Sequence, residues 1–415
     1  MRGAQLPPGS LHFLQHQEVN ADQHFYLKRA EVLGPIFKIN LNGAYTTCVL
    51  GHERAMQLVA ANEDHLPGVT IDLKCLFPIG AIREMTGETH QRYRRLFIEA
   101  TQATPLSIDR DYSEQVIKDG LAALAQTSAT VAGDAIRERL RQMTTGIMFR
   151  VLFGIREESP HFHGLVANYR RFGPTNPVHA IKDEHACAFK EIIATLREIA
   201  QDIQDNTQAD YPACFLRHFV ECGALDDTLL GNLAYLFEPA HFDVYSLWHW
   251  VLTLLASHPE VSSTFKSKLD AAARRQYAEA IVFETLRMEQ SEVLYRCVTE
   301  DIVFDGFLLP AGTRLRVLLW EGHKNGAAFP SPFTFDPSRF VEQKHGREKF
   351  APFGLGQHHC VGANLVVGLT TLFVQILLEE YTVVASEAGP SHRGAYHWQP
   401  SPACRIRLMP RAIPN

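Results

Sequence analysis

Apolar positions recur with a helical period over much of this chain. They are spaced three to four residues apart over residues 112–155, 181–203 and 229–255, which predicts helices in these stretches. Because residues 229–255 are apolar on nearly every side, we expect a helix buried on most of its surface. Pro259 is typical of the first turn of the helix that follows. The pattern therefore predicts a mainly helical protein.

A shorter alternating pattern predicts a small amount of strand. Residues 36–41 alternate apolar and polar, Asn42-Gly43 is a two-residue turn signal, and residues 46–50 complete a hairpin. Further short strands are expected in residues 298–319 and 396–408. We find no repeat, low-complexity segment or internal linker. We therefore predict one domain over residues 1–415, mainly α with a minor β-sheet region.

Composition narrows the class of protein. The chain has 415 residues, 46% hydrophobic, with a net charge of −6, so a nucleic-acid surface is not indicated. No window offers the roughly 20 uninterrupted apolar residues of a membrane span. The N-terminus lacks the apolar core of a signal peptide. We expect a cytoplasmic protein without a membrane anchor. The 8 cysteines show no paired spacing, which argues against a zinc site or a disulfide scaffold.

One loop carries a single cysteine between glycines. It reads F-G-x-G-x-H-x-C-x-G, with Phe353, Gly354, His358, Cys360 and Gly362 at the fixed positions. Glycines permit backbone angles that other residues avoid and leave room for a large flat group beside the main chain. Amides converging on the sulfur can stabilise a thiolate. The ordinary alternative is an inert buried cysteine. The other matches described below argue against it.

The loop resembles the haem-binding loop of the cytochrome P450 family, and the order of elements is similar over essentially the whole chain. The resemblance implies the cytochrome P450 fold and haem b as cofactor. Cys360 would be the axial thiolate ligand of the iron, and such a ligand favours O–O cleavage. The resemblance assigns the other fixed residues of the loop, Phe353, Gly354, His358 and Gly362, to the haem site.

An E-x-x-R pair lies on a predicted helix. Glu284 and Arg287 are three residues apart and therefore share a helix face. A solvated surface ion pair would have the same spacing. The segment 335–340 is similar to one that supplies a second arginine to this pair in the P450 family, and Arg339 takes that position. The resemblance implies a structural role, in which two guanidinium groups share one buried carboxylate.

Four basic residues match positions that hold the haem propionates in the family. His90 and Arg94 are four apart on a predicted helix and share a face. Burying two propionates requires cationic or hydrogen-bonding partners. The resemblance assigns this role to His90, Arg94, Arg296 and His358. A solvated surface charge is the alternative for any one of them.

The long apolar helix departs from the family pattern. There the family places an acidic residue followed by a threonine, and both help to deliver protons during oxygen activation. In one register Asp243 takes the acidic position and Val244 replaces the threonine. In the other, found by counting back from His258, Asp243 itself takes the threonine position. Either register lacks the hydroxyl, and a bulge at Pro239 could reconcile the two.

Three nearby residues, Asp243, Glu238 and His241, are then candidate proton carriers, with Val244 beside them. Glu238 and His241 are equally well explained as satisfied polar groups in a distorted helix. A substrate hydroxyl or an ordered water could also replace the threonine.

The resemblance implies a monooxygenase that oxidises a small organic molecule, with a place in specialised-metabolite biosynthesis. Electrons would come from NAD(P)H through a separate reductase and a ferredoxin or flavodoxin. A basic patch could receive this donor, although an ordinary solvated charge run would look the same. It comprises Arg92, Arg95, Lys344, His345, Arg347 and Lys349.

Two alternatives to this function stay open. One is peroxide-driven oxidation, oxidative coupling, or rearrangement or dehydration without the usual threonine. The other is a haem-binding sensor without turnover.

Overall fold

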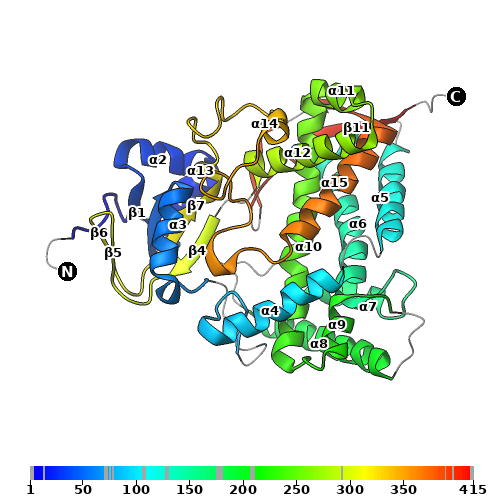
Figure 1. The fold of residues 1–415 in the computed structure, drawn as a ribbon, viewed down its shortest axis with the longest axis horizontal. Helices are drawn as coiled ribbons and strands as arrows, with labels where there is room; N and C mark the ends of the chain where they lie inside the picture. Colours follow the sequence, from blue (N-terminus) through cyan, green and yellow to red (C-terminus); the bar gives the residue numbers. More distant parts are fainter. Residues whose placement is uncertain are drawn as a thin grey trace. The chain divides into compact units, whose positions relative to one another are not determined.

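The computed structural model describes residues 4–12, 15–69, 73, 76, 79–104, 109–126, 130–173, 181–205, 211–290, 293–387, 389–394 and 397–411. Helices dominate these residues and the strands are short, as expected from the sequence (Figure 1). The chain forms two compact units. Unit 1 comprises Met1–Val69, Phe283–Cys360 and Ser391–Gln399, and unit 2 comprises Thr70–Val282, Val361–Pro390 and Pro400–Asn415. The expectation of a single domain stays a prediction.

Unit 1 is built on short helices and three groups of strands. Its helices are α1 (Gln15–Ala21), α2 (Phe25–Leu33), α3 (His52–Ala61), η1 (Glu63–His65), α13 (Leu319–Gly322), α14 (Ser338–Glu342), η2 (Gly356–His358) and the end of α12 (Ala271–Glu289). Its strands are β1 (Ile36–Leu41), β2 (Ala44–Leu50), β4 (Val293–Cys297), β5 (Ile302–Phe304), β6 (Phe307–Leu309), β7 (Arg314–Leu318), β9 (His392–Arg393) and β10 (Trp398–Gln399).

The main sheet of unit 1 has the strand order β1-β2-β7-β4. Strands β1 and β2 form the predicted hairpin, and Asn42 and Gly43 at its turn have φ values of 53° and 77°. Both values are positive, as a two-residue hairpin turn requires. Strand β2 pairs with β7 in parallel, and β7 pairs with β4 in antiparallel orientation. This last pairing fixes Tyr295 opposite Arg316.

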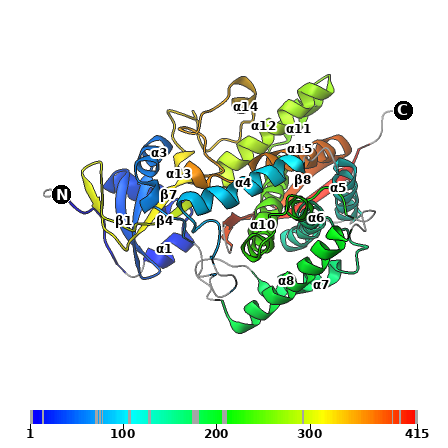
Figure 2. The same ribbon diagram turned by 60° about the horizontal axis from the view of Figure 1, so that its bottom comes forward.

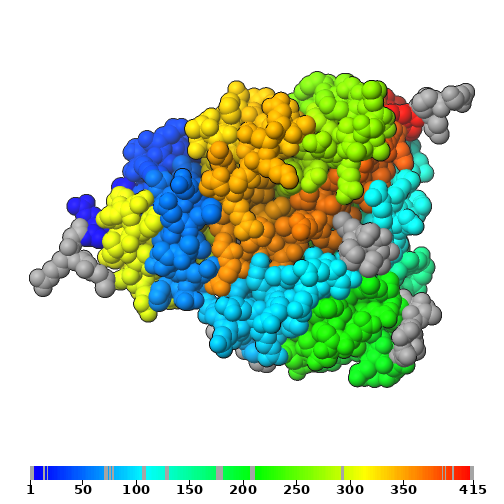
Figure 3. All heavy atoms as spheres, viewed as in Figure 1, coloured from blue at the N-terminus to red at the C-terminus, as the bar shows by residue number. Residues whose placement is uncertain are grey.

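Both faces of this sheet are buried, and alternate residues of each strand supply them. Ile36, Val49 and Val317 pack with α3 on one face. Phe37, Cys48 and Leu318 pack with α1 and α2 on the other. The β5–β6 hairpin lies against α3 on the surface of this unit, held by an ion pair of 2.9 Å between Arg54 Nε and Asp305 Oδ2 (Figure 3).

Unit 2 contains most of the helices. They are α4 (Gly87–Ala103), α5 (Arg110–Ala125), α6 (Gly133–Phe153), α7 (Phe162–Phe172), α8 (Asp183–Gln204), α9 (Phe215–Glu221), α10 (Asp227–Ser257), α11 (Pro259–Ser267), α15 (Ala363–Glu380) and the first part of α12. Strands β3 (Val131–Ala132), β8 (Tyr381–Glu387) and β11 (Arg405–Pro410) form a sheet in the order β3-β11-β8. The stretch predicted over residues 112–155 is thus two helices, α5 and α6, with β3 between them.

Helix α10 is the predicted buried helix, and it lies beside α6 and α15 in two views (Figures 1 and 2). Trp248 joins it to α15. The indole Nε1 donates to Thr370 Oγ1 over 3.2 Å, and the ring stacks on Phe373 with centroids 4.3 Å apart. Among the described helices, α15 alone is long and apolar enough to cross a membrane. Half of its apolar window is buried.

Candidate active site

The cysteine loop in unit 1 is held by its own backbone. Cys360 N donates to Phe353 O over 2.9 Å, which closes the loop at its base. Gly354 and Gly356 have φ values of 82° and 71°, a region that favours glycine. Gly362 differs, because its φ is −87° and any residue could adopt it. It is the N-cap residue of α15 and belongs to unit 2. Cys360 itself is exposed.

A carboxylate outside the loop fixes its second glycine. Glu63 Oε1 accepts a hydrogen bond of 2.5 Å from Gln357 N. A Cβ atom added to Gly356 would lie 2.6 Å from the same oxygen and 3.0 Å from a methyl carbon of Val59. Only glycine therefore fits at this position. No sequence pattern pointed to Glu63, because the contact joins residues almost three hundred positions apart.

Two buried histidines fix the segment that leads into the loop. His52 Nδ1 lies 2.9 Å from Lys349 O, and its Nε2 lies 2.9 Å from Leu319 O. His323 Nε2 accepts a hydrogen bond of 3.1 Å from Ala351 N. Burial lowers the pKa of His52, whereas the two carbonyl oxygens favour its protonated ring. Neither histidine was singled out from the sequence, where an isolated histidine carries no spacing signal.

The E-x-x-R pair is fully buried in unit 1. Arg287 Nε and Nη2 donate to the two oxygens of Glu284, each over 2.7 Å. Both side chains are 0% exposed. Arg339 Nε lies 3.4 Å from Glu284 Oε1, so one carboxylate serves two guanidinium groups. Asp336 N donates to the same oxygen over 2.9 Å.

Arg287 also binds the chain segment that follows α13. Its Nη1 donates to Pro332 O over 2.7 Å and to His323 O over 3.2 Å. Its Nη2 donates to Thr334 O over 3.1 Å. This one guanidinium therefore satisfies three carbonyls of an irregular segment while it neutralises Glu284. The arrangement is a fold-stabilising network and contains no group that could act on a substrate.

The candidate propionate ligands are distributed over both units. Arg296 lies on β4 in unit 1, 4% exposed, and its Nη1 donates to Tyr295 O over 3.1 Å. His358 lies in η2 of the same unit, half-buried. In unit 2, His90 and Arg94 lie one turn apart on α4, with His90 1% exposed and Arg94 half-buried. Two of the four side chains, His90 and Arg296, are therefore buried within their own unit, and the other two are half-buried.

Helix α4 is tied to the start of α10. Asp226 is the N-cap of α10, and its Oδ1 accepts a hydrogen bond of 2.7 Å from Leu229 N. Its Oδ2 accepts one of 2.9 Å from the hydroxyl of Tyr93. Arg92 Nη2 lies 3.5 Å from that oxygen, so this member of the expected basic patch has an acidic partner. These contacts set the face of α4 that carries His90 and Arg94.

The exposure of α10 distinguishes its faces. Between Thr228 and Leu252, Leu236, Ala240 and Asp243 alone are half-exposed. Their spacings of four and three place them on one face. Val244 is 0% exposed and lies about 100° further around the helix. Asp243 therefore occupies the accessible face, and Val244 points into the packed interior of unit 2.

Glu238 and His241 lie on the opposite side of α10. They are 5% and 6% exposed. The ring of His241 stacks on Phe237 with centroids 4.6 Å apart, and its Nδ1 lies 2.9 Å from Glu238 O. The helix is α-helical throughout Asp227–Ser257, with no bulge at Pro239 to turn these side chains around. The helix geometry thus separates two of the three candidate proton carriers from Asp243.

The environment of His241 predicts an acid-sensitive fold. Because Nδ1 faces a carbonyl oxygen, the neutral ring carries its hydrogen there. Burial lowers its pKa to about 4. As the pH falls, the unfolded chain, whose ring has the ordinary pKa of about 6.5, therefore binds a proton before the folded protein does. The free energy of unfolding should be fully present above about pH 6.5 and should fall by about 3 kcal/mol as the pH is lowered through about 4.

Urea unfolding at two pH values on either side of this window would measure the loss. In His241→Gln the difference between them should shrink, whereas in His163→Gln, a control at an exposed position, it should not. An unchanged acid dependence in His241→Gln would assign the effect to other groups.

The residues present fit a flat metal group held by one thiolate. Cys360 is exposed in a loop whose glycines leave room beside the main chain, and Arg296 supplies a buried cation for an acidic edge. Among the described residues, no three His, Cys, Asp or Glu side chains gather as a metal site. An exposed cysteine and a buried arginine are residue types that can hold haem, a macrocycle that brings its own four ligands.

Comparison with known proteins agrees with this geometry. The chain is 24% identical over 400 residues to an abscisic acid 8′-hydroxylase of Solanum lycopersicum, covering 87% of this chain and 82% of that protein. It is 24% identical over 311 residues to a trans-cinnamate 4-monooxygenase of Medicago sativa, covering 62% of this chain and 61% of that protein. An identity of 24% leaves the substrate of this chain open.

The fold is shared with solved structures. A cyanobacterial cytochrome P450 with retinoic acid bound superposes with a TM-score of 0.79 at 20% identity, covering 98% of this chain and 100% of that one. A zebra fish cytochrome P450 with progesterone gives 0.77 at 17% identity, covering 94% and 100%. The model of the cytochrome P450 family matches residues 5–393. The chain therefore belongs to the cytochrome P450 family of haem-thiolate monooxygenases.

Proposed function

We propose that this chain oxidises a small organic molecule in specialised metabolism, with Cys360 as the thiolate ligand of its haem. Support comes from the exposed sulfur of Cys360 in a loop closed by a hydrogen bond of 2.9 Å from Cys360 N to Phe353 O. When bound, the haem–thiolate group supplies oxygen activation, and the thiolate donates the electron density that favours O–O cleavage. Membership of an enzyme family argues against a sensor without turnover.

Residues of the chain would hold this group at its edges. His90, Arg94, Arg296 and His358 are the proposed partners of its propionates. A buried cation needs partners that compensate its loss of hydration, and a propionate is such a partner. Phe353, Gly354 and Gly362 would border the ring. Glu284, Arg287 and Arg339 have a structural role in this proposal, because their network lies inside unit 1 and binds backbone carbonyls.

The electron source is part of the proposal. In this proposal a reductase with a ferredoxin or flavodoxin supplies electrons from NAD(P)H. Lys344, Arg347 and Lys349 are exposed in unit 1 and available to an acidic donor. His345 is half-buried, with its Nε2 3.1 Å from Arg339 O, and is a weaker candidate.

Asp243 is the proposed proton carrier. It is the one acidic side chain on the half-exposed face of α10 among the described residues. A carboxylate can hold a proton and pass it on, which is the task that a threonine and an acid share in the family.

A second candidate function follows from the missing threonine at the same position. Without the hydroxyl, the chain could use hydrogen peroxide directly instead of dioxygen and two electrons.

The carbon-monoxide complex of the reduced protein tests the ligand. We expect its absorption at the position typical of thiolate-ligated haem. Cys360→His should keep some haem, because a ring nitrogen can bind iron, but should lose this band. Cys187→Ser, at another exposed cysteine, is the matched control and should keep it. A band that survives in Cys360→His would move the ligand elsewhere.

A further inference from the structure

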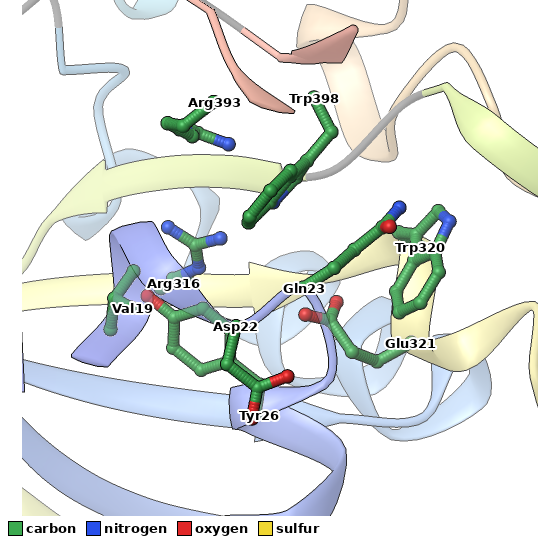
Figure 4. Close-up of a pocket in the computed structure, with 9 residues that line it drawn as sticks. All are labelled: Val19, Asp22, Gln23, Tyr26, Arg316, Trp320, Glu321, Arg393 and Trp398. Atoms are coloured by element: carbon green, nitrogen blue, oxygen red, sulfur yellow. The ribbon is translucent and has the colours of Figure 1, made fainter. Parts of the chain in front are cut away.

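A narrow cleft lies within unit 1, away from the cysteine loop in the sequence. It is bounded by α1, α2, β7, α13, β9 and β10, and Gln23, Tyr26, Arg316, Glu321 and Trp398 are among its walls (Figure 4). The cleft has a volume of about 290 Å³ when the open space at its mouth is included. The part that can hold the centre of a water molecule is about 10 Å³. That is about the space that one water requires.

Arg316 is a buried cation beside this cleft. It is 4% exposed and projects from β7 into the face of the sheet that Phe37, Cys48 and Leu318 make apolar. Its Nη1 donates to the hydroxyl of Tyr295, its cross-strand partner. Its guanidinium carbon lies 4.1 Å from the ring centroid of Tyr26. This geometry is a cation–π contact, which is favourable for a desolvated guanidinium.

Two polar atoms at the cleft have no partner in the described part of the chain. Arg316 Nε and Tyr26 Oη are buried and make no hydrogen bond to any described residue. Tyr26 is 3% exposed, so solvent does not reach its hydroxyl. Buried polar groups are rarely left in this condition, and an ordered water is the usual remedy. Both atoms belong to residues that line the same small cavity.

The charges around the cleft restrict what can occupy it. The lining carries charges of both signs: Arg316 and Arg393 would repel a cation, and Asp22 and Glu321 would repel an anion. Arg316 and Glu321 stand apart in the close-up (Figure 4), and Arg316 forms no ion pair within 4.0 Å in the described chain. A neutral molecule that both accepts and donates hydrogen bonds satisfies both sides. Water is a molecule of this kind, and about 10 Å³ is enough space for one.

We infer that the cleft binds one structural water, which accepts a hydrogen bond from Arg316 Nε, shares one with Tyr26 Oη and directs a hydrogen toward Glu321. The water would join α2, β7 and α13. It would also support β4, because Arg316 holds Tyr295, the residue before Arg296. Successive residues of a strand point to opposite faces, so this support lies behind the proposed propionate ligand. That last step rests on the proposed function.

A crystal structure of the holoenzyme at a resolution that shows ordered water tests the site. We expect one peak within hydrogen-bonding distance of Arg316 Nε and Tyr26 Oη. A crystal soaked in bromide should show no anomalous peak there. A bromide peak would identify an anion site instead. A cleft closed by direct contact between these side chains would also overturn the inference.

The variant Tyr26→Phe keeps the ring over the guanidinium and removes one partner of the water. We expect the peak to weaken or disappear and the Tm to fall by roughly 1–3 °C. An unchanged peak and Tm would show that Tyr26 holds no water. Arg316→Met should lose the peak completely, and Tyr26→Phe decides the question if that variant does not fold.

Haem retention separates this inference from the proposed function. If the water supports β4, Tyr26→Phe should release haem faster than the wild type while it keeps the thiolate band. If the wild type lacked the thiolate band, the proposed function would fail, but the water peak would still report on the cleft. A water peak with unchanged haem release would contradict the supporting role of the site.

Discussion

Glu284→Ala and Arg287→Ala should each yield little soluble protein with haem. In Glu284→Ala the guanidinium of Arg287 would stay 0% exposed without the carboxylate that accepts two bonds of 2.7 Å from it. Breaking a buried pair in this way costs roughly 3–5 kcal/mol. Since whole proteins are stable by only about 5–15 kcal/mol, a loss of this size unfolds a large fraction of the molecules.

Soluble yield and haem content per chain measure this effect. The pair between Asp134 and Arg137 provides a matched control, because it has the same i,i+3 spacing and a similar distance of 2.8 Å but is exposed. Asp134→Ala should change stability by less than about 1 kcal/mol. If Glu284→Ala and Asp134→Ala gave equal yields, burial of the first pair would have no energetic consequence, contrary to the argument.

A double variant separates the ion pair from the wider network. Glu284→Leu with Arg287→Met removes both charges, and replacing a buried pair by apolar residues is often tolerated. Here we expect no rescue, because His323 O, Pro332 O and Thr334 O would each lose the donor that Arg287 provides. Recovery of the double variant would show that Arg287 serves Glu284 alone.

What the sequence predicted was local or strongly patterned. Asn42-Gly43 specifies a tight turn by itself, and the spacing of Glu284 and Arg287 puts both on one face of any helix. The apolar run that became α10 needed only its own composition. These features depend on residues a few positions apart, so a single sequence contains the information.

What the sequence could not predict depends on distant segments. The carbonyl partners of Arg287 lie 36 to 47 positions away, and Glu63 reaches Gln357 across 294 positions. No spacing rule links such residues, because tertiary folding alone brings them together. The register of α10 is an intermediate case. The sequence left Asp243 or Val244 as the residue replacing threonine, and the structure places Asp243 on the half-exposed face of the helix.

Asp243→Asn should uncouple electron use from product formation. The amide keeps the size of the side chain but cannot carry a proton, and losing a general acid typically costs on the order of 100-fold or more in rate. We expect NAD(P)H consumption with surrogate redox partners to continue, product to fall by at least about 10-fold, and hydrogen peroxide to appear in its place. Substrate binding, followed by its spectral shift, should change little, because the exchange conserves shape.

Two threonine variants test the face as well as the residue. Asp243→Thr places a hydroxyl on the half-exposed face and should recover part of the lost product. Val244→Thr places it where Val244 is 0% exposed, so it should give no gain over the wild type. The opposite ranking would mean that Val244 faces the reacting group. Normal coupling in Asp243→Asn would assign proton delivery to the substrate or a water chain. If wild type and variants formed product only with added hydrogen peroxide, the dioxygen-dependent reading would fail, and peroxide-driven oxidation would replace it.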